Sequence, residues 1–275
     1  MCIALWALDH QDYALILFSN RDEFLSRPTQ DAHFHDFETG IESRSGNAEG
    51  NILSGRDIKA GGTWFGVTRT GRVALLGSLT SNFLLSDSLE SLEDQVRRMT
   101  PQDAKFAGFN LLLFTAAPQG RADGPLHFDP LLVTNHGSGG TITSLPLSAP
   151  ERLCGCVSNA VGELNKDWPK VKQAKKEFDG LLQTLCVDTK EEELTDRLFN
   201  LLADFSESWR TPESVTERSH LRKTIHVAPF GISLDVKKTG ETVFIERDIW
   251  KLVDGQAVKA SPESQRVFRF QIKPK

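Results

Sequence analysis

Two apolar segments at the start of the chain constrain the fold most strongly, because neither of them has a polar face. Residues 1–8 (MCIALWAL) and 13–19 (YALILFS) are apolar at both alternating positions, and a polar turn at 9–12 separates them. A strand that faces solvent on one side alternates apolar and polar residues, whereas a strand covered on both faces does not. The sequence therefore predicts a hairpin deep inside a sheet that is covered on both faces.

More strands are expected further along the chain. Turn residues between short apolar runs predict two more hairpins, over 63–76 and over 232–247. Three other runs have strand-like patterns, namely 109–116, 126–134 and 267–272. The polar stretch 26–50 is expected to be a long loop.

The middle of the chain changes to helical periodicity. Apolar residues at helical spacing predict a short helix over 88–99 and two longer amphipathic helices over 171–185 and 194–205. Hairpins, then two helices, then hairpins, without a regular βαβ alternation, are typical of an α+β fold rather than of a doubly wound sheet. We expect one domain over 1–275.

Composition excludes several classes of function. The net charge is -5, and the longest basic cluster is the short stretch 172–176, so nucleic-acid binding is not expected. No run approaches the 18 or so apolar residues of a membrane span, and the apolar start lacks the basic lead-in of a signal peptide. The 4 cysteines form no C-x-x-C pair, which suits a reducing compartment, the cytoplasm by default or the interior of an organelle.

The strongest candidate for chemistry is Cys2. An antiparallel hairpin returns the end of its second strand to the start of its first, so Arg21 and Asp22 should arrive near Cys2. If Met1 is removed, one residue supplies a thiol and an α-amine, with reference pKa values of about 8.5 and about 7.7–8.0. Arg21 would favour the thiolate and Asp22 would hold the amine. The reaction would be attack on an amide or other acyl carbonyl, through an acyl-enzyme that water resolves.

A structural alternative stays open at this point. Cysteine is among the most buried residue types, and a cysteine in an apolar strand is commonly a packing residue. The N-R-D-E run at 20–23 would also suit a solvated turn with an exposed ion pair.

The chain also carries a set of motifs that resembles a known family. Eight motifs occur in order: M-C-I at 1–3, N-R-D-E-F at 20–24 followed by S-R-P at 26–28, L-S-G-x-D at 53–57, G-G-T-W-F-G at 61–66, G-F-N-L at 108–111, V-S-N-A at 157–160, W-P-K-V at 168–171 and V-F-I-E-R at 243–247. They resemble the NRDE family, the homologs of transport and Golgi organization protein 2.

This resemblance implies a fold and a biology. The implied fold is a four-layer αββα sandwich of the N-terminal nucleophile (Ntn) hydrolase type, in which related cysteine enzymes cleave amide bonds. The implied biology is the movement of haem out of membranes and stores, lipid and acyl-CoA balance, Golgi organization and mitochondria. The resemblance therefore extends the expected location from the cytoplasm to the mitochondrion or the Golgi.

The resemblance also assigns roles to particular residues. Cys2 matches the nucleophile, Arg21 the thiolate partner, Asp22 the holder of amine or substrate, and Asn159 the oxyanion donor. Arg222, within S-H-L-R, is the counterpart of a catalytic arginine that the family carries near its C-terminal hairpin. The residues expected to bind ligand in the same cleft are Asn20, Trp64, Asn82 and His226. No metal site is expected; His33 and His35 are read as surface residues, no cofactor is required, and haem would be a transported ligand.

Three functions follow from these expectations. The first is a haem or lipid (acyl-CoA) trafficking and homeostasis factor that binds its ligand in the cleft at Cys2, with transient membrane or protein contacts. The second is an N-terminal cysteine amidohydrolase acting on a non-peptide C–N amide bond. The third is an interaction protein with a vestigial site. Enzyme status and oligomeric state stay open.

Overall fold

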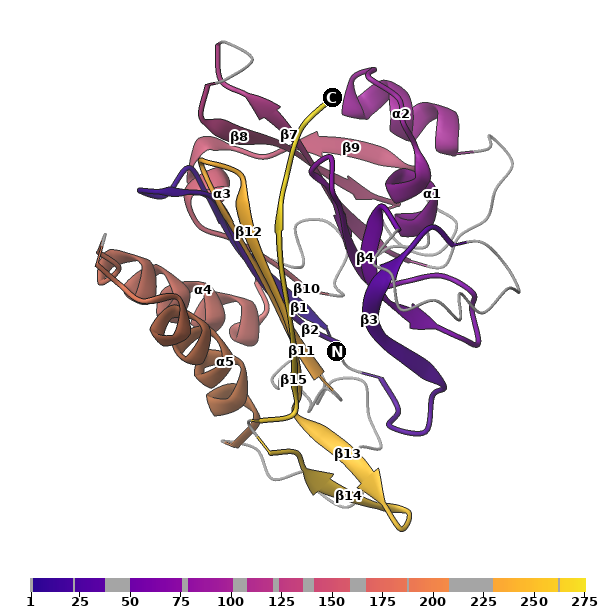
Figure 1. The fold of residues 1–275 in the computed structure, drawn as a ribbon, viewed down its shortest axis with the longest axis vertical. Helices are drawn as coiled ribbons and strands as arrows, with labels where there is room; N and C mark the ends of the chain where they lie inside the picture. Colours follow the sequence, from indigo (N-terminus) through magenta and orange to yellow (C-terminus); the bar gives the residue numbers. More distant parts are fainter. Residues whose placement is uncertain are drawn as a thin grey trace. The chain divides into compact units, whose positions relative to one another are not determined.

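The computed structural model describes residues 2–21, 23–37, 50–75, 79–100, 108–120, 124–135, 141–158, 167–186, 188–207, 230–261 and 263–275. The chain divides into two compact units, Met1–Ser26 with Ser148–Arg269, and Arg27–Leu147 with Phe270–Lys275. Each unit has a mainly antiparallel sheet with helices packed on one of its faces (Figure 1). The predicted α+β class is therefore confirmed, and a single domain over 1–275 stays a prediction.

The sheet of the first unit has six strands in the order β10-β1-β2-β11-β12-β15. Their bounds are β1 (Ile3–Leu8), β2 (Tyr13–Arg21), β10 (Gly155–Ser158), β11 (Phe230–Lys237), β12 (Glu241–Asp248) and β15 (Gln265–Gln271). β1 and β2 form the predicted hairpin, with Ile3 opposite Asn20 and Leu8 opposite Leu15. All of β1 is buried, as is β2 after its first residue. The two-sided burial expected from the apolar runs is thus confirmed.

Two long helices, α4 (Pro169–Gln183) and α5 (Glu191–Glu207), pack on one face of this sheet. They are the two amphipathic helices predicted from periodicity, and Figure 1 shows them side by side. Phe18 of β2 meets Phe178 of α4 edge to face, with ring centroids 4.9 Å apart. Full burial of a side chain of this size stabilises the fold by roughly 1.5–3 kcal/mol. A short helix, α3 (Ala149–Leu153), precedes β10.

The sheet of the second unit has seven strands that follow sequence order from β3 to β9. Their bounds are β3 (Thr29–His35), β4 (Ile52–Asp57), β5 (Phe65–Thr68), β6 (Arg72–Leu75), β7 (Asn110–Pro118), β8 (Leu126–Thr134) and β9 (Thr143–Pro146). Two short helices, α1 (Thr80–Leu85) and α2 (Leu92–Met99), contribute to one apolar cluster with β4, β6, β7 and β8. β5 and β6 form the hairpin predicted at 63–76, with Gly71 at a φ of 86° in its turn.

Two expectations need correction in this unit. The stretch 26–50 is not all loop, because β3 lies within it and pairs with β4. Its first three residues are exposed and polar, which removes the alternating apolar signal on which a strand prediction depends. The helix expected over 88–99 begins only at Leu92, because the Ser91 side chain accepts a hydrogen bond from the Asp94 backbone N–H and caps it.

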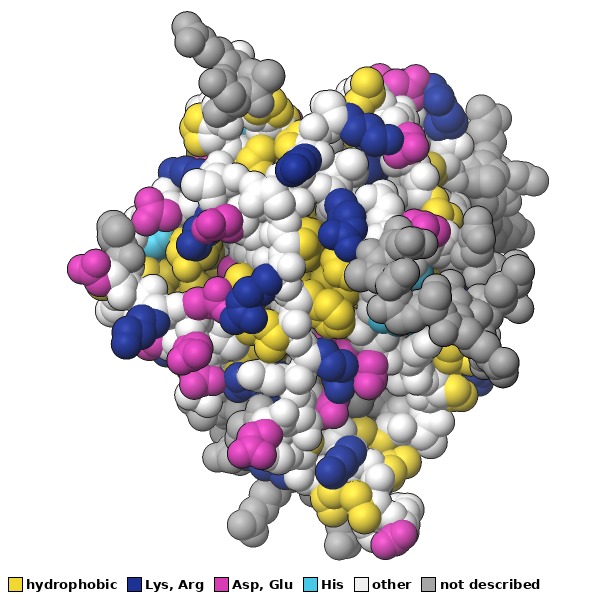
Figure 2. All heavy atoms as spheres, viewed as in Figure 1, with side chains coloured by type: hydrophobic (Ala, Val, Ile, Leu, Met, Phe, Trp, Pro, Cys, Tyr) yellow, Lys and Arg dark blue, Asp and Glu magenta, His cyan; other side chains and the backbone are white. Residues whose placement is uncertain are grey.

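A small separate hairpin joins β13 (Trp250–Val253) to β14 (Gln256–Lys259), which was not predicted. Figure 2 shows acidic and basic side chains interspersed on the visible face, without a large basic patch among the described residues there. Among the described residues, no helix combines the length and apolar character needed to cross a membrane.

Candidate functional site

Four strands of the first unit end together beside Cys2. Cys2 directly precedes β1, and Arg21 is the last residue of β2. Arg21 pairs with Phe230, the first residue of β11, while Ser158 at the end of β10 pairs with Ile3. The structure therefore brings Cys2 and Arg21 to the same edge of the sheet. The hairpin geometry expected from the sequence produces this arrangement, and the catalytic roles of the two residues stay predictions.

Hydrogen bonds fix the backbone around Cys2. The Ser158 hydroxyl donates to the Cys2 carbonyl oxygen at 2.7 Å, and the Ile3 backbone N–H donates to Asn20 Oδ1 at 2.7 Å. Ser19 Oγ donates to the Ile3 carbonyl oxygen at 2.9 Å. The backbone on both sides of the Cys2 peptide is thus held by side chains from β2 and β10.

Asn20 has a second polar group that is not used in this network. Its side chain is only 3% exposed, and its Nδ2 has no hydrogen-bond partner among the described residues. By strand alternation Asn20 lies on the same face as Phe18, the face that α4 covers. A buried amide left without a partner costs about 1–3 kcal/mol, so this NH₂ is a candidate donor to a ligand.

The Cys2 thiol is not primed as a thiolate in this structure. Burial is the largest influence and raises the pKa of Cys2. The N-terminal amino group, Lys170 and Arg21 act in the opposite direction, and Glu23 adds to the increase. The net result is a protonated thiol at neutral pH. The guanidinium of Arg21 lies 5.6 Å from the centre of the Phe230 ring, and Arg21 is itself buried.

A buried lysine, Lys170, is a candidate site residue that the sequence analysis did not single out. It is the second residue of α4 and is 2% exposed. Burial lowers its pKa to about 8, and the thiols of Cys2 and Cys156 raise it. Its Nζ also lies 5.3 Å from the centre of the Trp168 ring. The sequence held a signal for it, because Lys170, Ala174 and Phe178 follow one helical face at a spacing of four.

The thiols of Cys154 and Cys156 are also protonated. Burial raises the pKa of Cys156, and it raises the pKa of Cys154 to about 11. The 4 cysteines are all described, and none forms a disulfide. The edge of the sheet therefore presents the Cys2 thiol and an amide donor beside two buried cations, Arg21 and Lys170.

Of the other six residues predicted for the site, the structure describes two, Trp64 and Asn82. Asp22, Asn159, Arg222 and His226 lie outside the described residues. Trp64 and Asn82 belong to the second unit, where Asn82 is exposed on α1. The Trp64 ring packs against Gly55 so closely that a Cβ on Gly55 would lie 2.7 Å from Trp64 Cζ2. Trp64 and Asn82 stay predictions as ligand-binding residues.

The two histidines of β3 make local contacts. Their rings are 4.9 Å apart, and His35 Nε2 lies 2.8 Å from Ser54 Oγ. Burial lowers the pKa of His35 to about 3. Within the described ranges, no group of three or more His, Cys, Asp or Glu side chains is arranged to hold a metal ion.

Comparisons with known proteins place this geometry in context. The family model described as Transport and Golgi organisation 2 matches residues 1–251. The Transport and Golgi organization 2 homolog of Mus musculus is 33% identical over 135 residues, and that of Homo sapiens is 33% identical over 135 residues. Each match covers 41% of this chain and 44% of the relative, so the chain spans less than half the length of these curated relatives.

One solved structure is also similar. It is the Caenorhabditis elegans ortholog of N-acylethanolamine-hydrolyzing acid amidase, with a TM-score of 0.47 and 10% sequence identity. The alignment covers 87% of this chain and 93% of that chain. A likeness this distant carries no statement about activity.

Proposed function

Because the family model matches residues 1–251, the chain belongs to the Transport and Golgi organisation 2 family, and we propose that it binds haem or an acyl-CoA at the Cys2 edge of its first sheet. In this proposal the protein is a trafficking and homeostasis factor that takes up the ligand and releases it to a membrane or a partner protein. The proposed locations are the cytoplasm, the Golgi surface and the mitochondrion. No cofactor is required for this role.

The observation that carries the proposal is the unpartnered Nδ2 of Asn20. Oδ1 of the same side chain already accepts a hydrogen bond from the Ile3 N–H. The side-chain amide therefore cannot flip by 180° without breaking that bond. The NH₂ group is therefore fixed in place as a donor. A thioester carbonyl or a haem propionate supplies the oxygen acceptor that this group lacks.

The charges at this edge support an anionic ligand. Arg21 and Lys170 are both buried, and both lower the pKa of the Cys2 thiol. Positive charge at a poorly solvated site attracts an anionic ligand more strongly than it would in water. Acyl-CoA carries phosphates and haem carries propionates, so each brings negative charge to these cations. The neutral Cys2 thiol would lie against the acyl carbonyl, or ligate haem iron after losing its proton.

A second candidate function is the amidohydrolase, which the position of the Asn20 amide also favours. After removal of Met1, the Cys2 sulfur would attack the amide carbonyl carbon, and its proton would pass to the α-amine. The C–S bond forms, the C–N bond breaks, and the leaving amine takes that proton. Water then hydrolyses the thioester. An amide donor at the oxyanion is worth about a hundred- to a thousandfold in rate.

Titration of the ligand into paired variants tests the proposal. Asn20→Asp keeps an oxygen acceptor for the Ile3 N–H and removes the NH₂ donor, whereas Asn200→Asp makes the same change on the exposed face of α5. We expect Asn20→Asp to weaken the binding of haem or acyl-CoA about tenfold or more, and Asn200→Asp to leave it unchanged. Equal affinity in the two variants would refute the site. Accumulation of a free acid from an amide substrate would favour the second function.

A further inference from the structure

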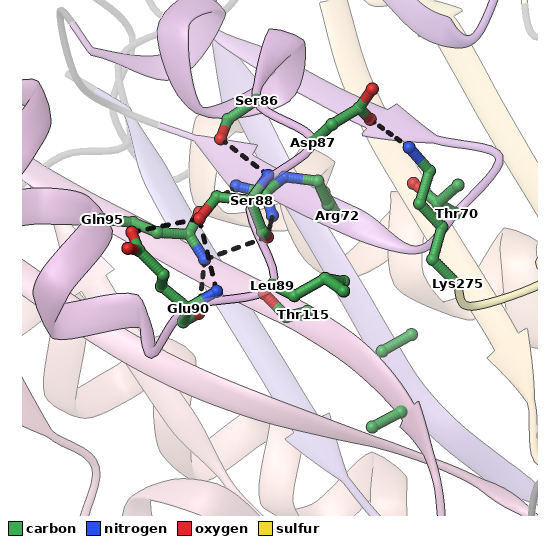
Figure 3. A pocket seen from close by; sticks show the side chains of 12 residues that line it. Thr70, Arg72, Ser86, Asp87, Ser88, Leu89, Glu90, Gln95, Thr115 and Lys275 are labelled. Atoms are coloured by element: carbon green, nitrogen blue, oxygen red, sulfur yellow. Dashed lines mark hydrogen bonds and ion pairs between the residues drawn. The ribbon is translucent and has the colours of Figure 1, made fainter.

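A second polar site lies in the other unit and shares no residue with the Cys2 edge. A pocket of about 190 Å³ is lined by residues of β6, of β7 and of the segment that leads into α2. All of its lining residues belong to the second unit. The volume is many times the roughly 10–15 Å³ that one water molecule requires, so a small molecule with ordered water fits. Figure 3 shows Arg72 among the side chains around it.

Arg72 is a buried cation whose hydrogen bonds to described residues all go to uncharged oxygens. It is 6% exposed, and its Nε donates to the Phe83 carbonyl oxygen at 2.9 Å. Nη1 donates to the Ser88 carbonyl oxygen at 3.3 Å, and Nη2 donates to Gln95 Oε1. Its guanidinium also stacks 3.9 Å from the centre of the Phe83 ring. Among the described residues, no carboxylate is hydrogen-bonded to this guanidinium.

Two donors of Arg72 are left over. A guanidinium has five N–H groups, and the three hydrogen bonds leave one on each terminal nitrogen. Thr115 pairs with Arg72 across β6 and β7, and both residues line the pocket. The buried Oγ1 of Thr115 has no partner among the described residues. Three polar groups are thus available among the residues that line the pocket.

The acidic groups of the pocket are each paired with a basic side chain. Asp87 is paired with Lys275, and Figure 3 shows the two side chains facing each other. Glu90 is paired with Arg98 and also accepts a hydrogen bond from Ser88 Oγ. The charge that stays without a directly bonded counter-ion is therefore that of Arg72. Burial lowers the pKa of Arg72 to about 10, with Asp87 raising it at a distance, so the group is still charged at neutral pH.

We propose that this pocket binds a small oxyanion, a phosphate or a carboxylate, through the spare N–H groups of Arg72 and the hydroxyl of Thr115. Planar guanidinium groups bind both anions with two parallel hydrogen bonds. The anion supplies the charge that the buried cation lacks, and it accepts from the unpartnered hydroxyl. This site is separate from the Cys2 edge, so failure of either proposal leaves the other unaffected.

The test follows the Arg72 side chain directly. Inorganic phosphate and succinate are titrated in separate experiments at constant ionic strength, and the ¹⁵N–¹H signal of Arg72 Nε is recorded by NMR. We expect a saturable shift of this signal with at least one of the two anions. The anion that gives the shift shows whether the pocket binds a phosphate or a carboxylate. Thr115→Val keeps the shape of the residue and removes the hydroxyl, and it should weaken binding about tenfold.

Two further variants complete the test. Arg72→Lys keeps the charge but loses the paired donors, so binding, followed in this variant by the backbone ¹⁵N–¹H signal of Thr115, should fall at least tenfold as well. Arg97→Gln removes an exposed arginine of α2 that pairs with Asp94, and binding should be unchanged. No saturable shift with either anion would overturn the proposal. Binding that survives Thr115→Val and Arg72→Lys but falls in Arg97→Gln would overturn it too, because the anion would then bind the surface of α2.

Discussion

Asn20 Oδ1 accepts the backbone N–H of Ile3 at 2.7 Å, so a side chain at the end of β2 holds the residue that follows Cys2. The two residues are also partners in the β1–β2 register. One amide therefore connects the strand pair, the position of Cys2 and the unpartnered NH₂ group proposed to meet the ligand.

Asn20→Ala should destabilise the fold. The substitution leaves the buried Ile3 N–H without its acceptor, and we expect the free energy of unfolding to fall by about 1–3 kcal/mol. Urea unfolding at neutral pH measures the change. Asn200→Ala, on the exposed face of α5, is the control and should have little effect, because alanine is a good helix former. If both variants unfold at the same urea concentration, the Asn20 bond contributes nothing.

Lys170→Met should change how stability depends on pH. Burial lowers the pKa of Lys170 to about 8, while the unfolded lysine keeps the ordinary value of 10.5. The unfolded chain therefore binds more protons between these values, so this group makes the wild type more stable as pH rises through that window. Lys170→Met lacks that increase and should be more stable than the wild type near neutral pH.

The comparison uses urea unfolding at about pH 7.5 and about pH 9, in the wild type, in Lys170→Met and in a control variant. The control is Lys172→Met, which removes an exposed lysine of α4 that pairs with Asp167. The difference between Lys170→Met and the wild type should shrink as pH rises. A difference that is the same at both pH values, as expected for Lys172→Met, would contradict the lowered pKa.

Asp235 should make the fold less stable as pH rises through the acidic range. Burial raises the pKa of Asp235 from 3.8 to about 7, although a hydrogen bond from Ser233 lowers it and Glu191 raises it further. The folded chain therefore holds a proton that the unfolded chain has released. This contribution is complete below the unfolded pKa and is lost as pH approaches the folded pKa of about 7.

Asp235→Asn replaces the carboxyl with a neutral group of the same shape. We expect it to gain stability over the wild type between about pH 5 and about pH 8, by an amount on the order of a few kcal/mol. Chemical unfolding at these two pH values measures the change. A constant difference between the two proteins would show that Asp235 does not titrate in this range.

Gly155 should be intolerant of a side chain. Gly155 is the first residue of β10. An added Cβ there would lie 2.0 Å from Trp6 Cε2. Gly155→Ala should cost at least about 1–3 kcal/mol, because backbone or ring must move. Gly180→Ala is the matched control within α4, where an added Cβ meets nothing within 4 Å. That variant should gain about 0.5–1 kcal/mol, and thermal unfolding separates the two outcomes.

The sequence predicted those elements whose residue pattern is compatible with only one type of secondary structure and burial. The apolar runs of β1 and β2 require cover on both faces, and the spacing in α4 and α5 requires an amphipathic helix. β3 was missed because its first residues are polar and exposed, so no alternating apolar signal exists. The start of α2 depends on the Ser91 cap, which propensity alone does not reveal.

The candidate site was predictable to the extent that a hairpin register fixes neighbours. Arg21 lies at the Cys2 edge because the turn at 9–12 sets the pairing. Lys170 was missed because a lysine is normally exposed, and only the tertiary packing of α4 buries it. Arg72 was missed for the same reason, since its burial depends on Phe83 and Gln95, which follow it on other elements.

The measurement that tests the central claim most directly is protection of Cys2 from alkylation. Iodoacetamide labelling is followed at each cysteine by peptide mass spectrometry, without ligand and with saturating haem or acyl-CoA in separate runs. The exposed Cys186 is the internal control. If the ligand binds at the Cys2 edge, Cys2 labelling should slow about tenfold or more while Cys186 labelling stays constant. Unchanged Cys2 labelling at saturating ligand, or equal slowing at both cysteines, would contradict the account.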